Sequence, residues 1–322
     1  MAELVTVDDI RAAAGRIAGV VVRTPLLPCL WSDPDRPLWL KPESLQATGA
    51  FKIRGAVNAV ATLTPEERSR GVVAHSSGNH AQAVAYAARL AGIKATIVMP
   101  DTAPAVKLAA TRAHGAEVVT VHPDDRDART AELVAAHGYA LIPPYDDPRI
   151  IAGQGTVGLE IAADAPDVDV VLVPVSGGGL SSGVAVAIKA LCPGSYVVLV
   201  EPELAGDAAE SFNRGERIAW TNAQTGRTMA DGLRVPVLGE LPWEHLRRYA
   251  DAVVTVTEDE IAEAVRVLAH NARLVAEPSG AVATAAYLFY ADELPVGRRH
   301  VAVVSGGNVE PAQYANLLNG GA

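Results

Sequence analysis

Aromatic residues, cysteines and clustered positive charges are all scarce in this chain of 322 residues. Its two cysteines, Cys29 and Cys192, form no CxxC pair, so we expect reduced packing residues rather than a disulfide framework or a zinc cage. The net charge of -10 and the absence of any Lys/Arg cluster exclude a nucleic-acid-binding face. No apolar run reaches membrane-spanning length, and residues 1–9 carry no signal pattern. We therefore expect a soluble cytoplasmic protein without a membrane partner.

Small and medium apolar residues are abundant, since hydrophobic residues make up 49% of the chain and aromatics only 5%. Short apolar runs that end in Gly/Ser/Asn-rich turns alternate with Ala-rich segments of helical period, which predicts α/β architecture with mainly parallel sheets. We expect strands at 72–74, 95–99, 116–121, 168–175, 196–200, 252–256 and 300–304. We expect helices at 55–63, 81–91, 105–114, 128–137, 150–163, 180–191, 258–270 and 280–290.

Two stretches break this alternation. The proline-rich segment 143–148 is the best candidate for a connection between two lobes, and 206–244 is predicted to be irregular with short helices. In open α/β sheets ligands bind outside the carboxyl ends of the strands, so the turns that follow the strands are the places to search for chemistry.

Lys52 is a lone amine in the small-residue and apolar turn TGAFKIRG. A lysine shielded from water loses part of its preference for the charged form, and the free amine condenses with an aldehyde to form a Schiff base. Taken alone, a lysine near a helix start is more often a solvated surface group. Lys52 gains weight only with the segments described next.

The turn Ser76-Ser77-Gly78-Asn79-His80 follows the first strand of the alternating region and opens a helix. Free backbone amides at a helix start, together with two hydroxyls, an amide and an imidazole, are suited to an anion such as a carboxylate. The alternative is an ordinary helix N-cap, which explains one of these side chains and leaves the others without a role.

A run of glycines, Gly177, Gly178 and Gly179, precedes Leu180 at the start of another helix. Consecutive glycines let backbone amides surround a phosphate, although the spacing is neither that of a Walker loop nor GxGxxG. The alternative is a flexible turn. The last strand ends in Ser305-Gly306-Gly307-Asn308, where the Ser305 hydroxyl could bind a ring nitrogen or serve only as a helix cap.

The segment from Glu201 to Asp207 places two carboxylates six residues apart around a small-residue turn. With a main-chain carbonyl between them, such oxygen ligands suit a hard divalent cation, Mg²⁺ or Ca²⁺. A solvated acidic loop is the alternative interpretation of this spacing.

Read together, the segments TGAFKIRG, HSSGNHAQAVAYAA, VMPDTAPAVKLAA, IAGQGTVGLEI, SGGGLSSG, VEPELAGDAAES, TMADGL, EPSGA and VVSGGNVE resemble the serine/threonine dehydratase and serine racemase family. That family belongs to the tryptophan synthase β-like enzymes, which use pyridoxal 5'-phosphate. The resemblance implies a two-lobed fold with the cofactor in a cleft between the lobes. It also implies a large cofactor-binding domain at 1–65 and 150–322 and a small domain at 66–149.

The resemblance implies roles for residues around the cofactor. Lys52 would carry the cofactor as a Schiff base, with Phe51 beside the ring. Asn79 would contact the phenolic oxygen of the ring, and Ser305 the pyridine nitrogen. The phosphate would be held by Gly177, Gly178, Gly179 and Leu180.

Substrate and metal positions are implied in the same way. Ser76, Ser77, Asn79 and His80 would form the carboxylate loop, and Ser77 would be a second catalytic acid/base opposite Lys52. A divalent cation would be bound by Glu201, the carbonyl of Ala205 and Asp207. Glu277 matches a carboxylate at the rim of the site, although a negative charge at a helix start also explains it.

The implied activity is dehydration and deamination of L-threonine or L-serine to a 2-oxo acid and ammonia. Alternatives within the family are serine racemisation and dehydration of 3-hydroxyaspartate, whose second carboxylate could pair with Arg149 or Arg227. A non-enzymatic anion-binding module is an alternative of another class and would be colourless. The family also implies a homodimer.

Departures from the family pattern concern substrate preference more than cofactor binding. Ser176 stands where many relatives have a fourth glycine, Ala50 where many have serine, and Pro143 where histidine is frequent. Because the chain ends twelve residues after Glu310, we expect no carboxy-terminal regulatory domain and therefore a catabolic or stand-alone enzyme.

Overall fold

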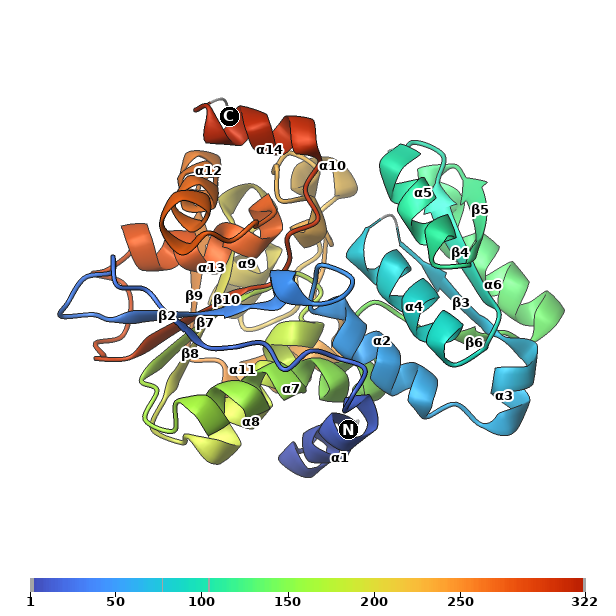
Figure 1. Ribbon diagram of the computed structural model, residues 1–322, viewed down its shortest axis with the longest axis horizontal. Helices are drawn as coiled ribbons and strands as arrows, with labels where there is room; N and C mark the ends of the chain where they lie inside the picture. Colours follow the sequence, from blue (N-terminus) through green and yellow to red (C-terminus); the bar gives the residue numbers. More distant parts are fainter. Residues whose placement is uncertain (1–2, 77, 104, 321–322) are drawn as a thin grey trace.

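The computed structural model describes residues 3–76, 78–103 and 105–320. The chain forms two lobes, each built around its own sheet with helices on both faces (Figure 1). The larger lobe contains both ends of the described chain, and the smaller lobe is formed by a central segment. In the described residues, no helix combines the length and the apolar character needed to cross a membrane.

The larger lobe has a six-stranded sheet in the order β1-β2-β10-β7-β8-β9. β1 is antiparallel to β2, and all other neighbouring strands are parallel. The bounds are β1 (Leu27–Pro28), β2 (Leu38–Pro42), β7 (Val170–Pro174), β8 (Tyr196–Pro202), β9 (Ala252–Val256) and β10 (His300–Val304). All residues of β7 and β10 are buried, because helices cover both faces, and this burial accounts for their unbroken apolar sequences.

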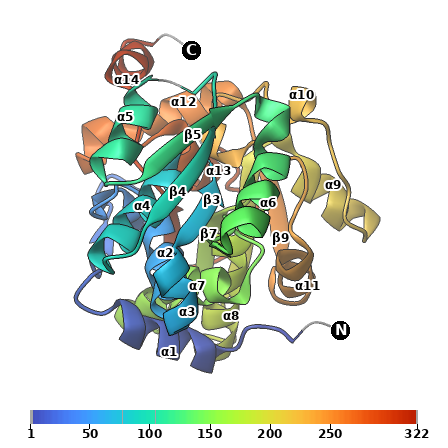
Figure 2. The same ribbon diagram turned by 90° about the vertical axis from the view of Figure 1, so that its right-hand side faces the viewer.

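The smaller lobe has a four-stranded parallel sheet in the order β5-β4-β3-β6, seen nearest the viewer in Figure 2. Its strands are β3 (Val72–His75), β4 (Ala95–Pro100), β5 (Glu117–Val121) and β6 (Ala140–Leu141). Helices α4 and α6 cover its opposite faces (Figure 1).

The α-helices supply the outer layers of both lobes. Their bounds are α1 (Val7–Ile17), α2 (Lys52–Ala61), α3 (Pro65–Arg70), α4 (Asn79–Leu90), α5 (Ala105–Ala113), α6 (Arg126–His137), α7 (Pro148–Asp164), α8 (Gly179–Leu191), α9 (Asp207–Arg214), α10 (Asn222–Thr225), α11 (Glu240–Tyr249), α12 (Glu258–Val267), α13 (Pro278–Phe289) and α14 (Pro311–Leu318). Successive β7 residues enter two cores: Val171 and Val173 pack with α7 and α8, whereas Val170 and Leu172 pack with α12 and α13. This alternation fixes the strand between two helical layers.

Helix α2 joins the lobes, since it packs against α4 of the smaller lobe and α7 of the larger one. Glycines make the approach of α2, α7 and α8 very close. A Cβ atom on Gly153 would lie 2.6 Å from the Cα atom of Gly55, and one on Gly183 would lie 2.5 Å from the backbone nitrogen of Gly155. No side chain larger than hydrogen fits at this glycine seam, formed by Gly55, Gly153, Gly155 and Gly183.

The expected strands and helices are present, with ends that differ by a few residues, but some elements were not anticipated. The expected helix over 258–270 ends at Val267, and Leu268–Ala272 forms a π-helix. Strand β2 was missed because Lys41 and Pro42 interrupt its apolar pattern. Helix α1 and helix α14 were also not anticipated. The irregular stretch 206–244 contains α9, α10 and the start of α11.

Candidate active site

Lys52 is the first residue of α2 and faces the chain segment that leaves the smaller lobe. Its Nζ atom donates a hydrogen bond to the carbonyl oxygen of Pro144 at 2.7 Å. Removal from water lowers the pKa of Lys52 from 10.5 to about 8. A substantial fraction of the amine is therefore neutral near pH 8, as a nucleophile or base requires. Phe51 is half-buried, with its ring centroid 5.1 Å from Nζ.

The turn before Lys52 is attached to the end of β10. The amide of Phe51 donates to the carbonyl oxygen of Ser305 at 3.0 Å, and Ala50 forms an antiparallel bridge with Gly306. The Ser305 side chain is buried, and its hydroxyl donates to the carbonyl oxygen of Ser279 at 3.3 Å. Lys52 and Ser305 are therefore held on neighbouring backbone segments.

The glycine loop, residues 177–180, connects β7 to the amino terminus of α8. Gly178 has φ 92°, a left-handed conformation that favours glycine. A Cβ atom on Gly177 would lie 2.4 Å from the ring of Tyr145, and one on Gly179 would lie 2.9 Å from the Cα atom of Tyr145. The first amides of α8 have no carbonyl partner within the helix, and buried Leu180 follows them. The loop thus has the features of a phosphate site.

The serine that replaces a fourth glycine does not fill this loop. The Ser176 hydroxyl accepts a hydrogen bond from the amide of Val235 at 3.2 Å. The side chain is therefore engaged with the segment that precedes α11 and is not directed at the loop amides by any hydrogen bond in the described residues.

The smaller lobe contributes the loop before α4. The Ser76 hydroxyl accepts from the amide of Gly78 at 3.2 Å. His80 is buried, and burial, supported by the nearby Lys52 charge, lowers its pKa to about 3. The neutral ring places Nε2 2.9 Å from the carbonyl oxygen of Ile142. Ser77, predicted as a second acid/base, lies outside the described residues.

Asn79 reaches from the smaller lobe to the larger one. Its Nδ2 atom donates to Oε1 of Glu277 at 2.6 Å, and its Oδ1 atom accepts from Nδ2 of Asn308 at 2.7 Å. Glu277 caps α13, and burial together with the Asp231 charge raises its pKa to about 7. The rim thus contains a carboxyl group that titrates near neutral pH.

Glu201 and Asp207 come together at the end of β8 and the start of α9. Glu201 accepts from the amides of Ala208 and Ala209 at 3.3 and 2.6 Å. Within the described residues, neither carboxylate oxygen of Asp207 has a hydrogen-bond partner. Burial raises the pKa of Asp207 to about 7, and burial plus the Asp207 charge raises that of Glu201 well above its usual value.

The arrangement of these two carboxylates suits a bound cation. Two neighbouring buried acids, one of them with both oxygens unpartnered, need a proton or a positive ion to offset repulsion and lost hydration. Buried Ala205 lies between them in sequence, in the 3-10 turn Glu203–Ala205. Among the described residues there is no cluster of three or more His, Cys, Asp or Glu side chains that could bind a metal. Any cation here would therefore need carbonyl or water ligands as well.

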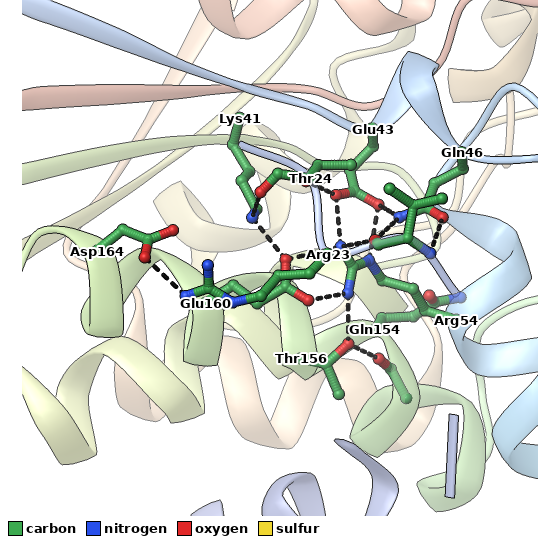
Figure 3. A network of polar contacts seen from close by, with 12 residues as sticks. Arg23, Thr24, Lys41, Glu43, Gln46, Arg54, Gln154, Thr156, Glu160 and Asp164 are labelled. Carbon is green, nitrogen blue, oxygen red and sulfur yellow. Dashed lines mark hydrogen bonds and ion pairs between the residues drawn. The ribbon is translucent and has the colours of Figure 1, made fainter. Parts of the chain in front are cut away.

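A buried charge cluster lies beneath the start of α2 (Figure 3). Arg54, two residues after Lys52, donates to both oxygens of Glu43 at 2.7 and 2.8 Å. It also donates to Glu160 at 2.7 and 2.9 Å. Lys41 completes the cluster through Glu160 at 2.6 Å. The two positive and two negative side chains anchor α2 to α7 and to the end of β2.

Opposite charges keep this cluster ionised despite its burial. Burial alone would lower the pKa of Arg54, but Glu43 and Glu160 outweigh it and raise that pKa. Burial alone would raise the pKa of Glu43, but the charge and hydrogen bonds of Arg54 lower it. The cluster is complete in itself and offers no vacant position to a ligand.

Two arginines considered for a second substrate carboxylate have other partners. Arg149 binds the carboxylate of Asp147 through Nη2 at 2.6 Å and Nε at 3.0 Å. Arg227 is exposed and donates to the carbonyl oxygen of Gln224 at 2.9 Å. Neither is linked to Lys52 or to the glycine loop by a contact in the described residues.

Sequence reasoning missed Tyr145 and Asn308. Tyr145 packs on the glycine loop one residue after the carbonyl that binds Lys52. It lies in a segment interpreted only as a connection, and its aromatic character in an aromatic-poor chain was the available signal. Asn308 belongs to a turn from which only Ser305 had been selected.

Comparison with known proteins places this geometry in a family. Residues 17–306 match the family model described as pyridoxal-phosphate dependent enzyme. The chain is 44% identical to the L-threonine ammonia-lyase of Thermotoga maritima, with 99% of this chain and 79% of the relative covered. It is 42% identical to the L-threo-3-hydroxyaspartate ammonia-lyase of Saccharomyces cerevisiae, with 98% and 97% covered.

A solved structure of serine racemase from maize has a similar fold, with a TM-score of 0.91 and 37% identity over 99% of this chain and 98% of the racemase. The expected two-lobed α/β fold and the expected family are therefore confirmed. From its sequence, its fold and the arrangement of its lysine and glycine loop, the chain belongs to the pyridoxal-phosphate dependent enzymes.

Proposed function

We propose that this protein removes water from L-threonine or L-serine, and that hydrolysis of the resulting unsaturated amino acid takes up a water, releases ammonia and leaves a 2-oxo acid. The observation that carries this proposal is the desolvated amine of Lys52 beside the segment that packs on the glycine loop. The threonine ammonia-lyase of Thermotoga maritima, 44% identical over nearly the whole chain, supports the choice of substrate.

The residues at the site fit pyridoxal 5'-phosphate. Lys52 would bind its aldehyde, the amides of the glycine loop its phosphate, Asn79 its ring oxygen and Ser305 its ring nitrogen. When bound, the cofactor supplies an electron sink for the charge left on the substrate after proton removal. The neutral Ser305 hydroxyl would donate its hydrogen to the ring nitrogen in place of the Ser279 carbonyl, without transferring a full proton, which would favour elimination over transamination.

Lys52 would remove the Cα proton of the substrate. A pKa of about 8 lets the amine accept a proton when neutral and release it again at the same pH. The loop before α4 would bind the substrate carboxylate, because helix amides and the side chains of Ser76, Asn79 and His80 lie there. Neutral His80 adds no charge that would compete with Lys52 for protons.

A divalent cation is part of the proposal. Glu201, Asp207 and the carbonyl of Ala205 would bind Mg²⁺ or Ca²⁺ at the start of α9. The unpartnered oxygens of Asp207 and the raised pKa values of both acids support this site. A bound cation would fix the loop that follows β8.

The domain division and assembly are also proposals. We place a large cofactor-binding domain at 1–65 and 150–322 and a small domain at 66–149, which assigns one sheet to each. A homodimer is proposed from the resemblance to the family alone. A cytoplasmic location agrees with the two buried free cysteines of the described chain.

Borohydride reduction followed by peptide mapping tests the assignment of Lys52. We expect a pyridoxyl label on Lys52, and we expect Lys52→Ala to lose both the visible absorbance and at least about 10³-fold in ammonia release, because nucleophile and base are lost together. Lys94→Ala, which alters an exposed lysine, is the matched control. Normal turnover by Lys52→Ala, or a label elsewhere, would refute the proposal, and colourless protein would favour an anion-binding module.

A further inference from the structure

A chain of side-chain amides crosses the boundary between the lobes. Nδ2 of Asn308 donates to the carbonyl oxygen of Thr48 at 2.8 Å and to Oδ1 of Asn79 at 2.7 Å. Nδ2 of Asn79 in turn donates to Oε1 of Glu277 at 2.6 Å. The chain connects the turn before Lys52, the turn after β10, the start of α4 and the cap of α13.

The carbonyl of Thr48 sets the direction of every hydrogen bond in this chain. A backbone carbonyl only accepts, so the nitrogen end of the Asn308 amide has to face Thr48. The second hydrogen of that nitrogen points to Asn79, which has to present its oxygen. The nitrogen of Asn79 is consequently turned towards Glu277 and away from Asn308.

Two glycines make room for this arrangement. Gly49 has φ 71°, and a Cβ atom there would lie 2.3 Å from Oδ1 of Asn308. A Cβ atom on Gly306 would lie 2.2 Å from Oε1 of Glu277. Asn308 and Glu277 therefore occupy space that any larger residue at these two positions would take away.

We propose that Asn308 is a positioning residue that fixes the orientation of the Asn79 side-chain amide, so that Asn79 offers donors to Glu277 and to the cofactor. This inference rests on the proposed function, in which Asn79 contacts the ring oxygen of pyridoxal 5'-phosphate. Asn308 acts only through Asn79. It sets which end of that amide the ring oxygen meets.

The hydrogen bond from Asn308 also keeps the orientation of the Asn79 amide the same whether Glu277 is protonated or ionised. The pKa of Glu277 is raised to about 7 by burial and by Asp231, which the charge of Lys107 opposes. Asp231 lies in the 3-10 turn Asp231–Leu233 and Lys107 in α5, and these are the charged groups that influence Glu277. With Asn308 present, Asn79 donates to either form of Glu277. Without Asn308, Asn79 is free to rotate, and its oxygen can then accept a hydrogen bond from the protonated form of Glu277.

A double-mutant cycle on the cofactor-loaded enzyme tests the inference. We compare the parent, Asn308→Ala, Asn79→Ala and the double variant by cofactor affinity, by kcat/KM and by the pH dependence of the visible absorbance. We expect Asn308→Ala to lose about five- to tenfold in kcat/KM, the effect of about one hydrogen bond. We expect the double variant to be no worse than Asn79→Ala, because Asn308 has no other route to the cofactor.

The absorbance readout separates positioning from general damage. In Asn308→Ala we expect a new spectral transition near pH 7, which the added change Glu277→Gln removes. Asn308→Asp keeps the shape of the side chain but cannot donate, and it gives the same result if Asn308→Ala does not fold. Losses that multiply in the double variant, or an unchanged absorbance profile, overturn the inference. A parent protein that binds no pyridoxal 5'-phosphate overturns the proposed function itself.

Discussion

The buried charge cluster beneath α2 and the acidic pair at the start of α9 are both buried and polar, but only one is complete. In the cluster, Arg54 and Lys41 balance Glu43 and Glu160. In the acidic pair, Glu201 and Asp207 repel one another, and the oxygens of Asp207 have no partner within the described residues. The cluster needs nothing further to be stable, whereas the pair needs a proton or a cation.

Lys52 stands between these two cases. It is desolvated like Arg54, but its only hydrogen bond in the described residues is to a neutral carbonyl, so no negative partner stabilises its charge. Burial without an opposite charge moves a pKa towards neutral pH, whereas at Arg54 and Glu43 the opposite charges outweigh burial and move the pKa away. At Lys41 burial outweighs the charge of Glu160, and the pKa is lowered. Buried charges with opposite charges beside them support the fold, whereas buried charges without such partners are the reactive groups.

Removal of Arg54 should have the largest effect on stability. Arg54→Ala leaves Glu43 and Glu160 without their main partner, and we expect a loss of about 3–5 kcal/mol in the free energy of unfolding. Lys52→Ala in the cofactor-free protein should be neutral or stabilising, because it removes a partly buried charge that has no opposite charge beside it. Denaturant unfolding measures both, with Arg11→Ala as control, since its pair with Asp8 is exposed. Equal losses in the free energy of unfolding for Lys52→Ala and Arg54→Ala would show that the two side chains do not differ in this way.

The acidic pair should respond to Mg²⁺ in a pH-dependent way. Its raised pKa values mean that the native state holds protons between about pH 4 and 7 that the unfolded state has released, so the free energy of unfolding falls as the pH rises through this window. At pH 8 Asp207 is largely ionised, and saturating Mg²⁺ should stabilise the protein by about 1–3 kcal/mol. At pH 5 protons occupy the pair, and Mg²⁺ should have little effect.

Asp207→Asn should stabilise the cation-free protein at pH 8 and abolish the response to Mg²⁺. Asp124→Asn, which alters an exposed carboxylate, should leave both unchanged. Thermal unfolding with and without a chelator measures these effects. A full response to Mg²⁺ in Asp207→Asn would place the cation elsewhere.

The smallest effect is expected at the ion pair between Lys107 of α5 and Asp231 of the larger lobe. The pair is partly exposed, so it should contribute about 0–1 kcal/mol and be screened by salt. We expect Lys107→Ala to raise the KM about two- to fivefold at low ionic strength, because the pair links the two lobes. We also expect a slightly higher pKa for Glu277, because the charge of Lys107 lowers that pKa. Lys94→Ala, which breaks a pair within one lobe, is the control. An increase in KM that persists at high salt would argue against an electrostatic role for the Lys107–Asp231 ion pair.

The parts of the candidate site that lie within short continuous segments could be predicted from the sequence. The turns around Asn79, Gly178 and Ser305 each follow an apolar strand, and this local pattern alone places each turn at the carboxyl end of a strand in a parallel sheet. Gly178 and Ser305 follow strands of the larger lobe, and Asn79 follows a strand of the smaller lobe. The desolvation of Lys52 was also foreseen from its apolar neighbours. Local patterns suffice because hydrogen bonding and burial of a βα unit are decided within about 30 residues.

What could not be predicted depends on contacts between distant residues. Asn308 and Asn79 are 229 positions apart, and no local pattern states that their amides meet. Tyr145 was taken for part of a connection because its contact with Gly177 arises only when two segments pack. Strand β2 was missed because Lys41 and Pro42 interrupt its apolar pattern, and the partners of buried Lys41, Glu160 and the carbonyl of Thr24, are distant in sequence.

The glycine seam gives the protein a point of weakness far from any reacting atom. Where helices contact each other through their backbones, no side chain can rotate to make room for an added methyl group, so one whole helix has to shift. A side chain on Gly153 of α7 would displace α2, whose first residue is Lys52. A substitution in the seam would misalign the reactive amine in a molecule that still folds, and an assay would mistake this mechanical fault for lost chemistry.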